Sequence, residues 1–250
     1  MKKPKVTIIL PNFNSEDFLK QTINSIVRQT YNNWELIIID DNSNSQTLKI
    51  LEKYSKQKKI RIIFLNKNIG AGPCRNLGMK KSKSNLLAFI DSDDLWVKNK
   101  LKEQVDFMIK NDLKFTYTNY ITFKKDSKKI HYIKCPKKMS YFDFLKNTSI
   151  GTSTMMVDKK ILGNIKFTNS KICEDYFFKC QILKKIKYAF CVNKYLTNYQ
   201  IRENSLQSKK LRNLFWILKI NKNFNKLNIF NNLFSVFFIS INSIRKYGLK

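Results

Sequence analysis

The sequence is poor in acidic residues and holds a single histidine. Its 250 residues include 18 Asp and Glu against 48 Lys and Arg, which gives a formal net charge of +30 at pH 7. The histidine, His131, lies in a lysine-rich stretch that is typical of an exposed hairpin. One histidine excludes a metal cage built from histidines, and it disfavours catalysis by a histidine-based triad.

Cysteine is also scarce and has no regular spacing. The five cysteines form no C-x-x-C pair, their number is odd, and no secretory signal precedes them. This usage indicates a reducing compartment. No apolar run reaches the length of a membrane-spanning helix. We therefore expect a cytoplasmic protein, with peripheral attachment at the inner face of the membrane as a further possibility.

The excess of positive charge has three explanations. A basic protein can bind nucleic acid, or it can be attracted to anionic lipid headgroups. The third explanation is compositional, since Lys, Asn and Ile are all abundant, as AT-rich coding produces. The lysines are scattered through every segment and form no separate arm. Composition is therefore favoured, and a membrane surface comes second.

Four short apolar runs alternate with helical patterns between residues 1 and 112. The runs cover 6–10, 34–39, 60–65 and 86–90, and apolar residues recur at helical spacing between them. Such alternation is typical of βαβ units. It predicts an α/β fold with a Rossmann-like, mostly parallel mixed sheet flanked by helices.

Two further parts follow in the chain. Residues 113–207 carry shorter and mixed signals, and residues 208–250 form a C-terminal helical tail rich in aromatic side chains. In the middle part we expect strands at 115–117, 121–123, 130–133, 153–157 and 195–199, and helices at 140–146 and 174–183.

Polar residues end three of the four apolar runs. Because ligands bind beyond the carboxyl ends of parallel strands, we expect these residues to meet along one rim of the sheet. The three segments are Pro11-Asn12-Phe13-Asn14, Asp40-Asp41-Asn42 and Asp91-Ser92-Asp93-Asp94.

The third segment carries the sharpest chemical signal. Asp91, Asp93 and Asp94 repel one another unless a positive group neutralises them. A hard divalent cation with oxygen ligands, Mg²⁺ or Mn²⁺, does this and could bridge to a diphosphate. The alternative is that Asp93 or Asp94 caps a helix that begins near Val97. The number of carboxylates and their place on the rim favour the metal.

The other candidates each have an ordinary structural explanation as well. Asp40 and Asp41 could accept hydrogen bonds from a ribose or a base, or could close a tight turn. Arg75 could meet an anionic group, although a surface arginine is the commoner case. Glu174 and Asp175 begin an apolar helix, where acids usually stabilise the helix dipole. The residues alone favour the dipole explanation for that pair.

Taken in order, these segments resemble the family-2 inverting glycosyltransferases, which have the GT-A fold. The resemblance covers roughly residues 5 to 205 and is more specific in the first half than in the second. It rests on the residues 6–14, 25–31, 34–43, 75–78 and 89–96 and on Glu174-Asp175-Tyr176.

For residues 1–112, the resemblance implies the nucleotide-sugar-binding half of the catalytic domain. Asp41 would hold the base, and Asp40 would support it. The motif Asp91-Ser92-Asp93 is a D-x-D motif, which implies that Asp93 binds the metal and that Asp91 lies near metal and ribose. The implied donor-binding residues are Pro11, Asn12, Asn14, Asp40, Asp41, Arg75 and Asp91.

For residues 113–207, the resemblance implies the acceptor-binding half of the same domain. Asp175 would be the catalytic base, with Glu174 and Arg202 on the acceptor side. Arg202 lies in a segment, 199–205, that resembles a family segment reading Tyr-Arg-x-x-x-x-Ser. Gln200 departs from that pattern, which leaves the role of this segment open.

The implied activity is metal-dependent transfer of one hexosyl group, with inversion, from a nucleotide-sugar to an acceptor hydroxyl. UDP is the expected nucleotide by family frequency. A cell-envelope glycan or a lipid-linked saccharide is the expected acceptor. The Q-x-x-R-W motif of processive synthases is absent, which favours single transfer over polymerisation.

Other functions stay open for this sequence. A GT-A-like nucleotidyltransferase would usually carry a basic, glycine-rich signature near the N-terminus, where this chain has Pro-Asn-Phe-Asn. A basic nucleic-acid-binding protein would have no acidic rim, so nucleic acid is not an expected partner. An inactive, transferase-like binding module is the third alternative.

The tail has one broad apolar face and one narrow polar arc. An apolar face with basic flanks suits the surface of an anionic membrane. The alternative is a helix packed on the catalytic domain or on a second subunit, and an arc of Asn and Ser instead of Lys argues for it. The apolar face comprises Ile229, Phe230, Leu233, Phe234, Phe237, Phe238, Ile241 and Ile244, and the arc comprises Asn231, Asn232, Ser235, Asn242 and Ser243.

Overall fold

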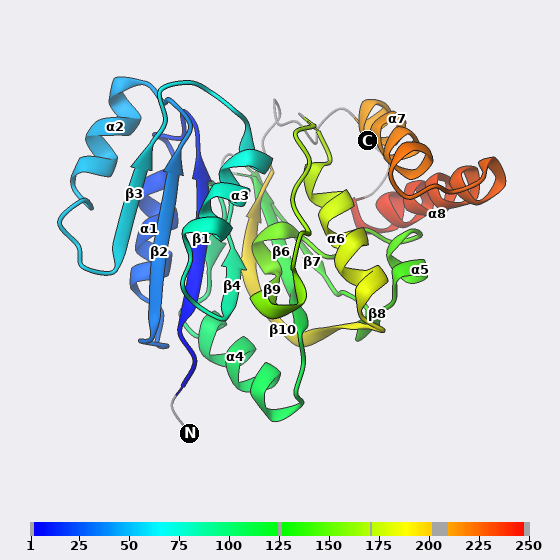
Figure 1. Cartoon of the computed structure of the whole chain (residues 1–250), viewed down its shortest axis with the longest axis horizontal. Helices are drawn as coiled ribbons and strands as arrows, with labels where there is room; N and C mark the ends of the chain where they lie inside the picture. Colours follow the sequence, from blue (N-terminus) through cyan, green and yellow to red (C-terminus); the bar gives the residue numbers. More distant parts are fainter. Residues whose placement is uncertain (1–2, 125–126, 171, 202–209, 248–250) are drawn as a thin grey trace.

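The centre of the structure is a ten-stranded mixed sheet with helices on both faces (Figure 1). The computed structural model describes residues 3–124, 127–170, 172–201 and 210–247. Within them the strands follow the order β3-β2-β1-β4-β9-β6-β10-β5, with β7 paired to β6 and β8 paired to β10. The predicted fold class, a mostly parallel mixed sheet flanked by helices, is confirmed.

The first part of the chain forms the parallel half of the sheet. In β1, β2 and β4 the side chains on both faces are covered, which is typical of parallel sheets, whereas β3 at the edge of the sheet is only partly covered. Ile8 and Leu10 of the first strand face α1, and Ile9 faces the opposite core. The elements are β1 (Val6–Asn12), α1 (Leu19–Val27), β2 (Trp34–Asp40), α2 (Ser45–Glu52), β3 (Ile60–Phe64), α3 (Ala71–Lys81), β4 (Leu86–Phe89) and α4 (Lys100–Lys110).

The second part extends the sheet with mixed pairing. Strand β9 lies antiparallel between β4 and β6, and β10 runs parallel to β6. The elements are β5 (Leu95–Trp96), β6 (Phe115–Lys124), β7 (Ser127–Ile133), β8 (Lys138–Met139), α5 (Tyr141–Phe144), β9 (Met156–Asp158), α6 (Glu174–Lys185) and β10 (Ala189–Gln200). Two 3₁₀ turns, η1 (Thr152–Thr154) and η2 (Lys159–Ile161), flank β9.

Three predictions for this part were wrong in detail. The strands expected at 115–117 and 121–123 are one strand, since polar Asn119 between them accepts a hydrogen bond from the backbone N–H of Cys135. The strand expected at 153–157 begins only at Met156, after η1. The last strand begins at Ala189 and not at residue 195, and it continues through irregular register shifts against β6.

The tail forms two helices, α7 (Lys210–Asn223) and α8 (Ile229–Tyr247), at the right of Figure 1. The polar arc of α8 faces the protein. The buried hydroxyl of Ser235 donates to the carbonyl of Leu145, and Asn232 donates to the carbonyl of Leu218. The apolar face points outward, with Phe230 80% and Phe237 60% exposed. Within the described residues, no helix is long and apolar enough to cross a membrane.

Candidate active site

The polar ends of β1 and β2 meet at the rim that the sequence predicted. The two strands are in register to their last residues, Asn12 opposite Asp40. The side-chain amide of Asn12 donates to the Asp40 carboxylate at 2.7 Å, and the N–H of Asp41 donates to the carbonyl of Asn12 at 2.8 Å. Pro11, directly before them, is buried in β1. Two of the three predicted polar segments, 11–14 and 40–42, thus begin from one hydrogen-bonded corner.

Asp40 and Asn14 hold the two loops of this corner together. The second carboxylate oxygen of Asp40 accepts the N–H of Ser43 at 3.1 Å, so both oxygens have partners inside the protein. Asn14 has a left-handed φ of 44°, donates its N–H to the Ser43 hydroxyl and accepts the N–H of Asn44 at 2.8 Å. These contacts fit the supporting role predicted for Asp40, because they fix the loops that carry its neighbours.

Asp41 joins the end of β2 to the loop that precedes α3. Its buried carboxylate accepts the backbone N–H groups of Ile69 and Gly70 at 2.7 and 2.8 Å. Gly70 has a φ of 90°, a conformation that glycine adopts without strain. Asp41 therefore fixes the start of α3, whose residues reach the second half of the site.

Arg75 of α3 is buried and connects the two halves of the chain. Its guanidinium donates to Asp91 at 2.6 Å and to Glu174 at 2.7 Å, and it lies 5.3 Å from the ring centre of Phe167. Burial disfavours its charge, but Asp91 and Glu174 outweigh burial and raise the pKa of Arg75. Burial also disfavours the charge of Glu174 and therefore raises the pKa of this carboxyl, although the positive charge of Arg75 opposes the shift. The surface position considered for Arg75 was wrong.

Gly72 allows this connection. A side-chain carbon at residue 72 would lie 2.4 Å from the carbonyl oxygen of Thr168 and 3.1 Å from Glu174. The first turn of α3 therefore packs directly against the segment that leads to α6. The role of Gly72 is close packing.

The Asp91–Asp94 segment is held from the second half of the chain. The N–H of Asp91 donates to the Ser153 hydroxyl at 3.0 Å, and that hydroxyl donates to the buried Asp94 carboxylate. The N–H of Gln200 also donates to Asp94, at 2.9 Å. Helix α4 begins at Lys100, so the alternative that Asp93 or Asp94 caps it was wrong.

Negative charge accumulates at this segment. Burial, and after it the charges of Asp93 and Asp91, raise the pKa of Asp94 well above its usual value. Asp91 and Asp93 are only half-buried. Sequence reasoning missed Ser153, because nothing local indicates that residue 153 folds back over residues 91 to 94.

Asp175 lies at the start of α6 beside a buried lysine. Its Oδ2 atom accepts hydrogen bonds from Lys179 at 2.5 Å and from the Thr152 hydroxyl at 2.7 Å. Burial alone would raise the pKa of Asp175, but Lys179 outweighs it and lowers the pKa to about 2. Lys179 was not among the predicted site residues, although its i, i+4 spacing from Asp175 on a helix was a usable signal. Arg202 lies outside the described residues.

Comparison with known proteins decides the family. Residues 7–169 match the family described as Glycosyl transferase family 2. The chain belongs to glycosyltransferase family 2. TuaG of Bacillus subtilis strain 168, assigned to teichuronic acid biosynthesis, is 35% identical over 210 residues, which are 83% of each chain. WfgD of Escherichia coli is 34% identical over 215 residues, which are 84% of this chain and 82% of WfgD. WfgD is described as a UDP-Glc:alpha-D-GlcNAc-diphosphoundecaprenol beta-1,3-glucosyltransferase.

Solved structures confirm the GT-A fold of this glycosyltransferase. TarS 1–349 of S. aureus in complex with UDP-GlcNAc has a TM-score of 0.73 at 19% identity, over 98% of this chain and 73% of TarS. The mannosyltransferase PcManGT of Pyrobaculum calidifontis, in complex with GDP-Man and Mn²⁺, has a TM-score of 0.71 at 11% identity. The similarity covers 100% of this chain and 77% of PcManGT. The resemblance to family-2, GT-A transferases is therefore confirmed.

The carboxylates of this glycosyltransferase fit a metal ion that needs further ligands from a substrate. In the part of the chain that the structure describes, no three His, Cys, Asp or Glu side chains are grouped to hold a metal by themselves. Mg²⁺ sites often use one or two carboxylates and complete the shell with substrate phosphates. Asp91 and Asp93 can supply such carboxylates, and a cation there would relieve the repulsion seen at Asp94.

Proposed function

We propose that this glycosyltransferase transfers a single hexosyl group, with inversion, from a UDP-sugar to a hydroxyl of a lipid-linked or cell-envelope saccharide. The observation that carries the proposal is the Arg75 bridge. One guanidinium pairs with Asp91 of the D-x-D motif and with Glu174, the neighbour of Asp175. Candidate donor ligands and the candidate base thus belong to one charged network.

The names of similar proteins support the substrates in this proposal. WfgD takes UDP-Glc and a diphosphoundecaprenol-linked GlcNAc, and the TarS complex contains UDP-GlcNAc. TuaG supports the cell-envelope context. The family assignment favours sugar transfer over the nucleotidyltransferase and nucleic-acid-binding alternatives, and nucleic acid is not among the proposed partners.

The proposed reaction is a single displacement. The acceptor oxygen attacks C1 of the donor sugar, the bond from C1 to the diphosphate breaks on the opposite face, and UDP leaves. Asp175 takes the proton of the acceptor hydroxyl as the new bond forms. Arg75 would offset the charge that grows on the leaving diphosphate. When bound by Asp91 and Asp93, Mg²⁺ or Mn²⁺ would supply further positive charge to the phosphates.

The direct test is UDP release. The purified chain, incubated with Mn²⁺ and single nucleotide-sugars, is expected to release nucleotide slowly without an acceptor and faster with a GlcNAc-diphosphate lipid. The anomeric configuration of the product, read by NMR, tests inversion. If no nucleotide-sugar is consumed under any of these conditions, the proposal fails.

The first prediction concerns nucleotide binding. Replacing Asp41 by Ala is expected to weaken UDP binding about tenfold or more, because a buried anionic acceptor contributes about 1.5–3 kcal/mol and here also fixes the loop at Gly70. Turnover at saturating donor should change much less. Calorimetric titration with UDP measures the effect, and Asp17→Ala, at an exposed position, is the control. An unchanged affinity would contradict a role for Asp41 in donor binding.

We also propose that the tail attaches the enzyme to an anionic membrane at its cytoplasmic face. Exposed patches of large apolar side chains on a folded domain mark contact surfaces. The lack of lysine in the polar arc does not argue against a membrane surface here, because the arc faces the protein and not the solvent. Exposed basic residues flank α8 along the chain, with Lys222 and Lys226 before it and Arg245 in its last turn, and this favours anionic lipid as the occupant of the patch. The exposed large apolar residues of the tail are Leu211, Phe215, Phe224, Ile229, Phe230, Leu233, Phe234, Phe237 and Ile244.

The second prediction tests this attachment. Replacing Phe230 and Phe237 together by Ser is expected to weaken binding to phosphatidylglycerol vesicles roughly a hundredfold, because each ring contributes about 1.5 kcal/mol or more when buried. Vesicle flotation measures the effect. The control is Phe64→Ser on β3, a half-exposed phenylalanine away from the tail. Equal flotation of the double variant and the control would sink the membrane proposal.

A further inference from the structure

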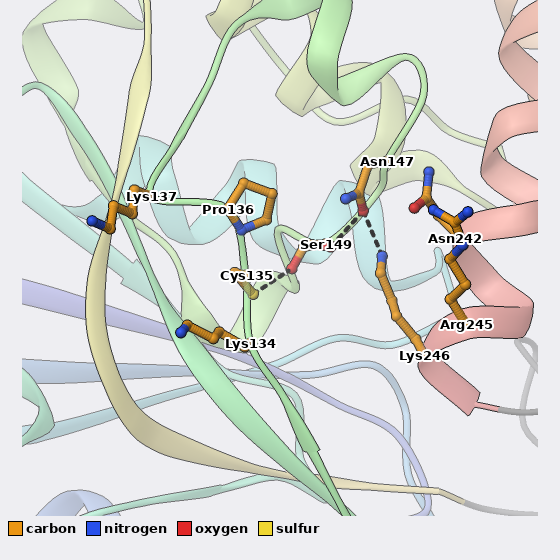
Figure 2. Close-up of a pocket in the computed structure, with 9 residues that line it drawn as sticks. All are labelled: Lys134, Cys135, Pro136, Lys137, Asn147, Ser149, Asn242, Arg245 and Lys246. Atoms are coloured by element: carbon orange, nitrogen blue, oxygen red, sulfur yellow. Dashed lines mark hydrogen bonds between the residues drawn. The ribbon is translucent and has the colours of Figure 1, made fainter.

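A basic pocket lies between the tail and the acceptor half of the enzyme. It has a volume of about 450 Å³ and is open to the surface (Figure 2). The strand-to-strand segment 134–137, the loop 147–149 and the last turns of α8 form its walls. The nine lining residues are Lys134, Cys135, Pro136, Lys137, Asn147, Ser149, Asn242, Arg245 and Lys246.

The pocket is positively charged and its walls contain no counter-charge. Lys134, Lys137, Arg245 and Lys246 are basic, and none of the nine lining residues is Asp or Glu. Cations grouped in this way repel one another unless an anion lies between them. The pocket therefore has an electrostatic deficit that an anionic ligand would relieve.

Lys246 shows this deficit most clearly. Its side chain is partly buried, and its ammonium donates to the neutral amide oxygen of Asn147 at 2.6 Å. The same amide oxygen accepts the hydroxyl of Ser149 at 2.5 Å. Burial lowers the pKa of Lys246 to about 8. A buried ammonium beside a neutral acceptor is costly, whereas a phosphate oxygen within reach would form a charge-assisted hydrogen bond.

The pocket is near the catalytic centre along the chain. Ser149 lies three residues before Thr152, and the hydroxyl of Thr152 donates to Asp175. Three residues span at most about 11 Å. A sugar that carries a diphosphate can therefore be considered as one ligand for both places, with the sugar toward Asp175 and the phosphates toward Lys246.

The pocket is also next to the proposed membrane surface. Arg245 and Lys246 belong to α8, the same helix whose outer face exposes Phe237 and Ile244. A phosphate attached to a lipid chain would lie at the depth of the lipid headgroups. A helix bound along the membrane surface lies at the same depth.

We propose that this pocket binds a phosphate group carried by a membrane lipid, with the diphosphate of the lipid-linked acceptor as its ligand. This inference rests on the proposed function for the identity of the acceptor. An anionic phospholipid headgroup shares the same chemistry and is the other source of such a phosphate.

Inorganic pyrophosphate is the first probe, because it has no lipid chain and does not respond to the apolar face. In EDTA, calorimetry is expected to show pyrophosphate binding that weakens about tenfold or more in Lys246→Met and in Arg245→Met. Arg245 is exposed, so its variant should fold normally even if Lys246→Met does not. Lys222→Met, at an exposed position of α7 outside the pocket, should bind like the wild type.

Vesicles then distinguish the two sources of phosphate. Wild-type protein is compared on phosphatidylcholine vesicles that contain either phosphatidylglycerol or a polyprenyl diphosphate at matched surface charge. Tighter binding to the diphosphate vesicles, lost in Arg245→Met, supports the acceptor. Equal binding to both assigns the pocket to headgroups and overturns the acceptor diphosphate as its ligand. Pyrophosphate binding that is absent, or equal in wild type and both pocket variants, overturns the pocket. Neither assay needs sugar transfer, so UDP release tests the proposed function separately.

Discussion

Replacing Asp93 by Asn is expected to abolish sugar transfer and to leave the fold intact. Asp93 is half-buried on the rim, and its charge raises the pKa of the neighbouring buried Asp94. Neutralising it removes repulsion within the folded chain, so thermal stability should stay the same or increase. Loss of a metal ligand should remove several kcal/mol of transition-state stabilisation, which is about a hundredfold or more in rate.

The measurement is UDP release against Mn²⁺ concentration. Asp93→Asn should need far more Mn²⁺ than the wild type, if it responds at all, and EDTA should stop the wild type. Asp106→Asn is the matched control, because Asp106 is a half-exposed aspartate on α4 that pairs with Lys102 on the same helix. Full activity of Asp93→Asn, or full wild-type activity in EDTA, would show that transfer does not depend on this metal site.

The first half of the fold was predictable because its signals are local. The runs that became β1, β2, β3 and β4 are mostly apolar, and strands buried on both faces, as β1, β2 and β4 are, need such a composition. The D-x-D segment was predictable for the same reason, since acidic residues directly follow an apolar run. The reason for a glycine at position 78 was not predictable from the sequence. A side-chain carbon there would lie 2.6 Å from Ile9, so this glycine is required by packing between α3 and β1.

The second half depends on contacts between distant residues. Strand β10 contains Asn193 and Lys194 in its middle, which break the apolar pattern, and its pairing with β6 resumes at Tyr195 after a register shift. Thr152 and Ser153 lie in a 3₁₀ turn and reach Asp175 and Asp94 across the fold. Arg75 and Glu174 are 99 residues apart and form one ion pair. No local pattern indicates such pairs, so only the order of motifs pointed to this site.

The orientation of α8 is a feature that hydrophobic periodicity cannot predict. The sequence separated the apolar face of α8 from its polar arc, but periodicity cannot say which of them faces the protein. Hydrogen bonds from Ser235, Asn232 and Asn242 to backbone carbonyls of the domain and of α7 decide it. The usual rule of burying the apolar face would have placed this helix the wrong way round.

The largest loss of turnover without loss of donor binding is expected from Asp175→Asn. A general base contributes roughly two to four orders of magnitude, and an amide cannot take the acceptor's proton. Donor binding should survive, because the predicted donor residues lie on the other side of the Arg75 bridge. UDP affinity by calorimetry and turnover at saturating donor are the two measurements. If turnover is nearly unchanged, the base is elsewhere, and Glu174 is the next residue to replace.

A loss of turnover in Asp175→Asn alone has a second explanation, because the change leaves the buried ammonium of Lys179 without its carboxylate partner. Breaking a buried pair in this way can cost about 3–5 kcal/mol of stability, and less here because Asp175 is 26% exposed. The double variant Asp175→Asn/Lys179→Met removes both charges. We expect it to regain thermal stability and to stay inactive. Recovery of turnover together with stability would show that Asp175 serves only as the partner of Lys179.

The single variant Lys179→Met tests the same base from the other side. Lys179 outweighs burial and holds the pKa of Asp175 at about 2, below the usual value of 3.8. The ion pair's contribution to stability is therefore complete above the usual pKa of 3.8, decreases as the pH falls below that value, and is lost as the pH falls through about 2. Without Lys179, burial, the largest influence on Asp175, is opposed by the weaker effects of Thr152 and Arg75, so the pKa of Asp175 should rise. The acid limb of the turnover–pH profile should then move to higher pH, whereas a residue with a purely structural role would lower turnover equally at every pH.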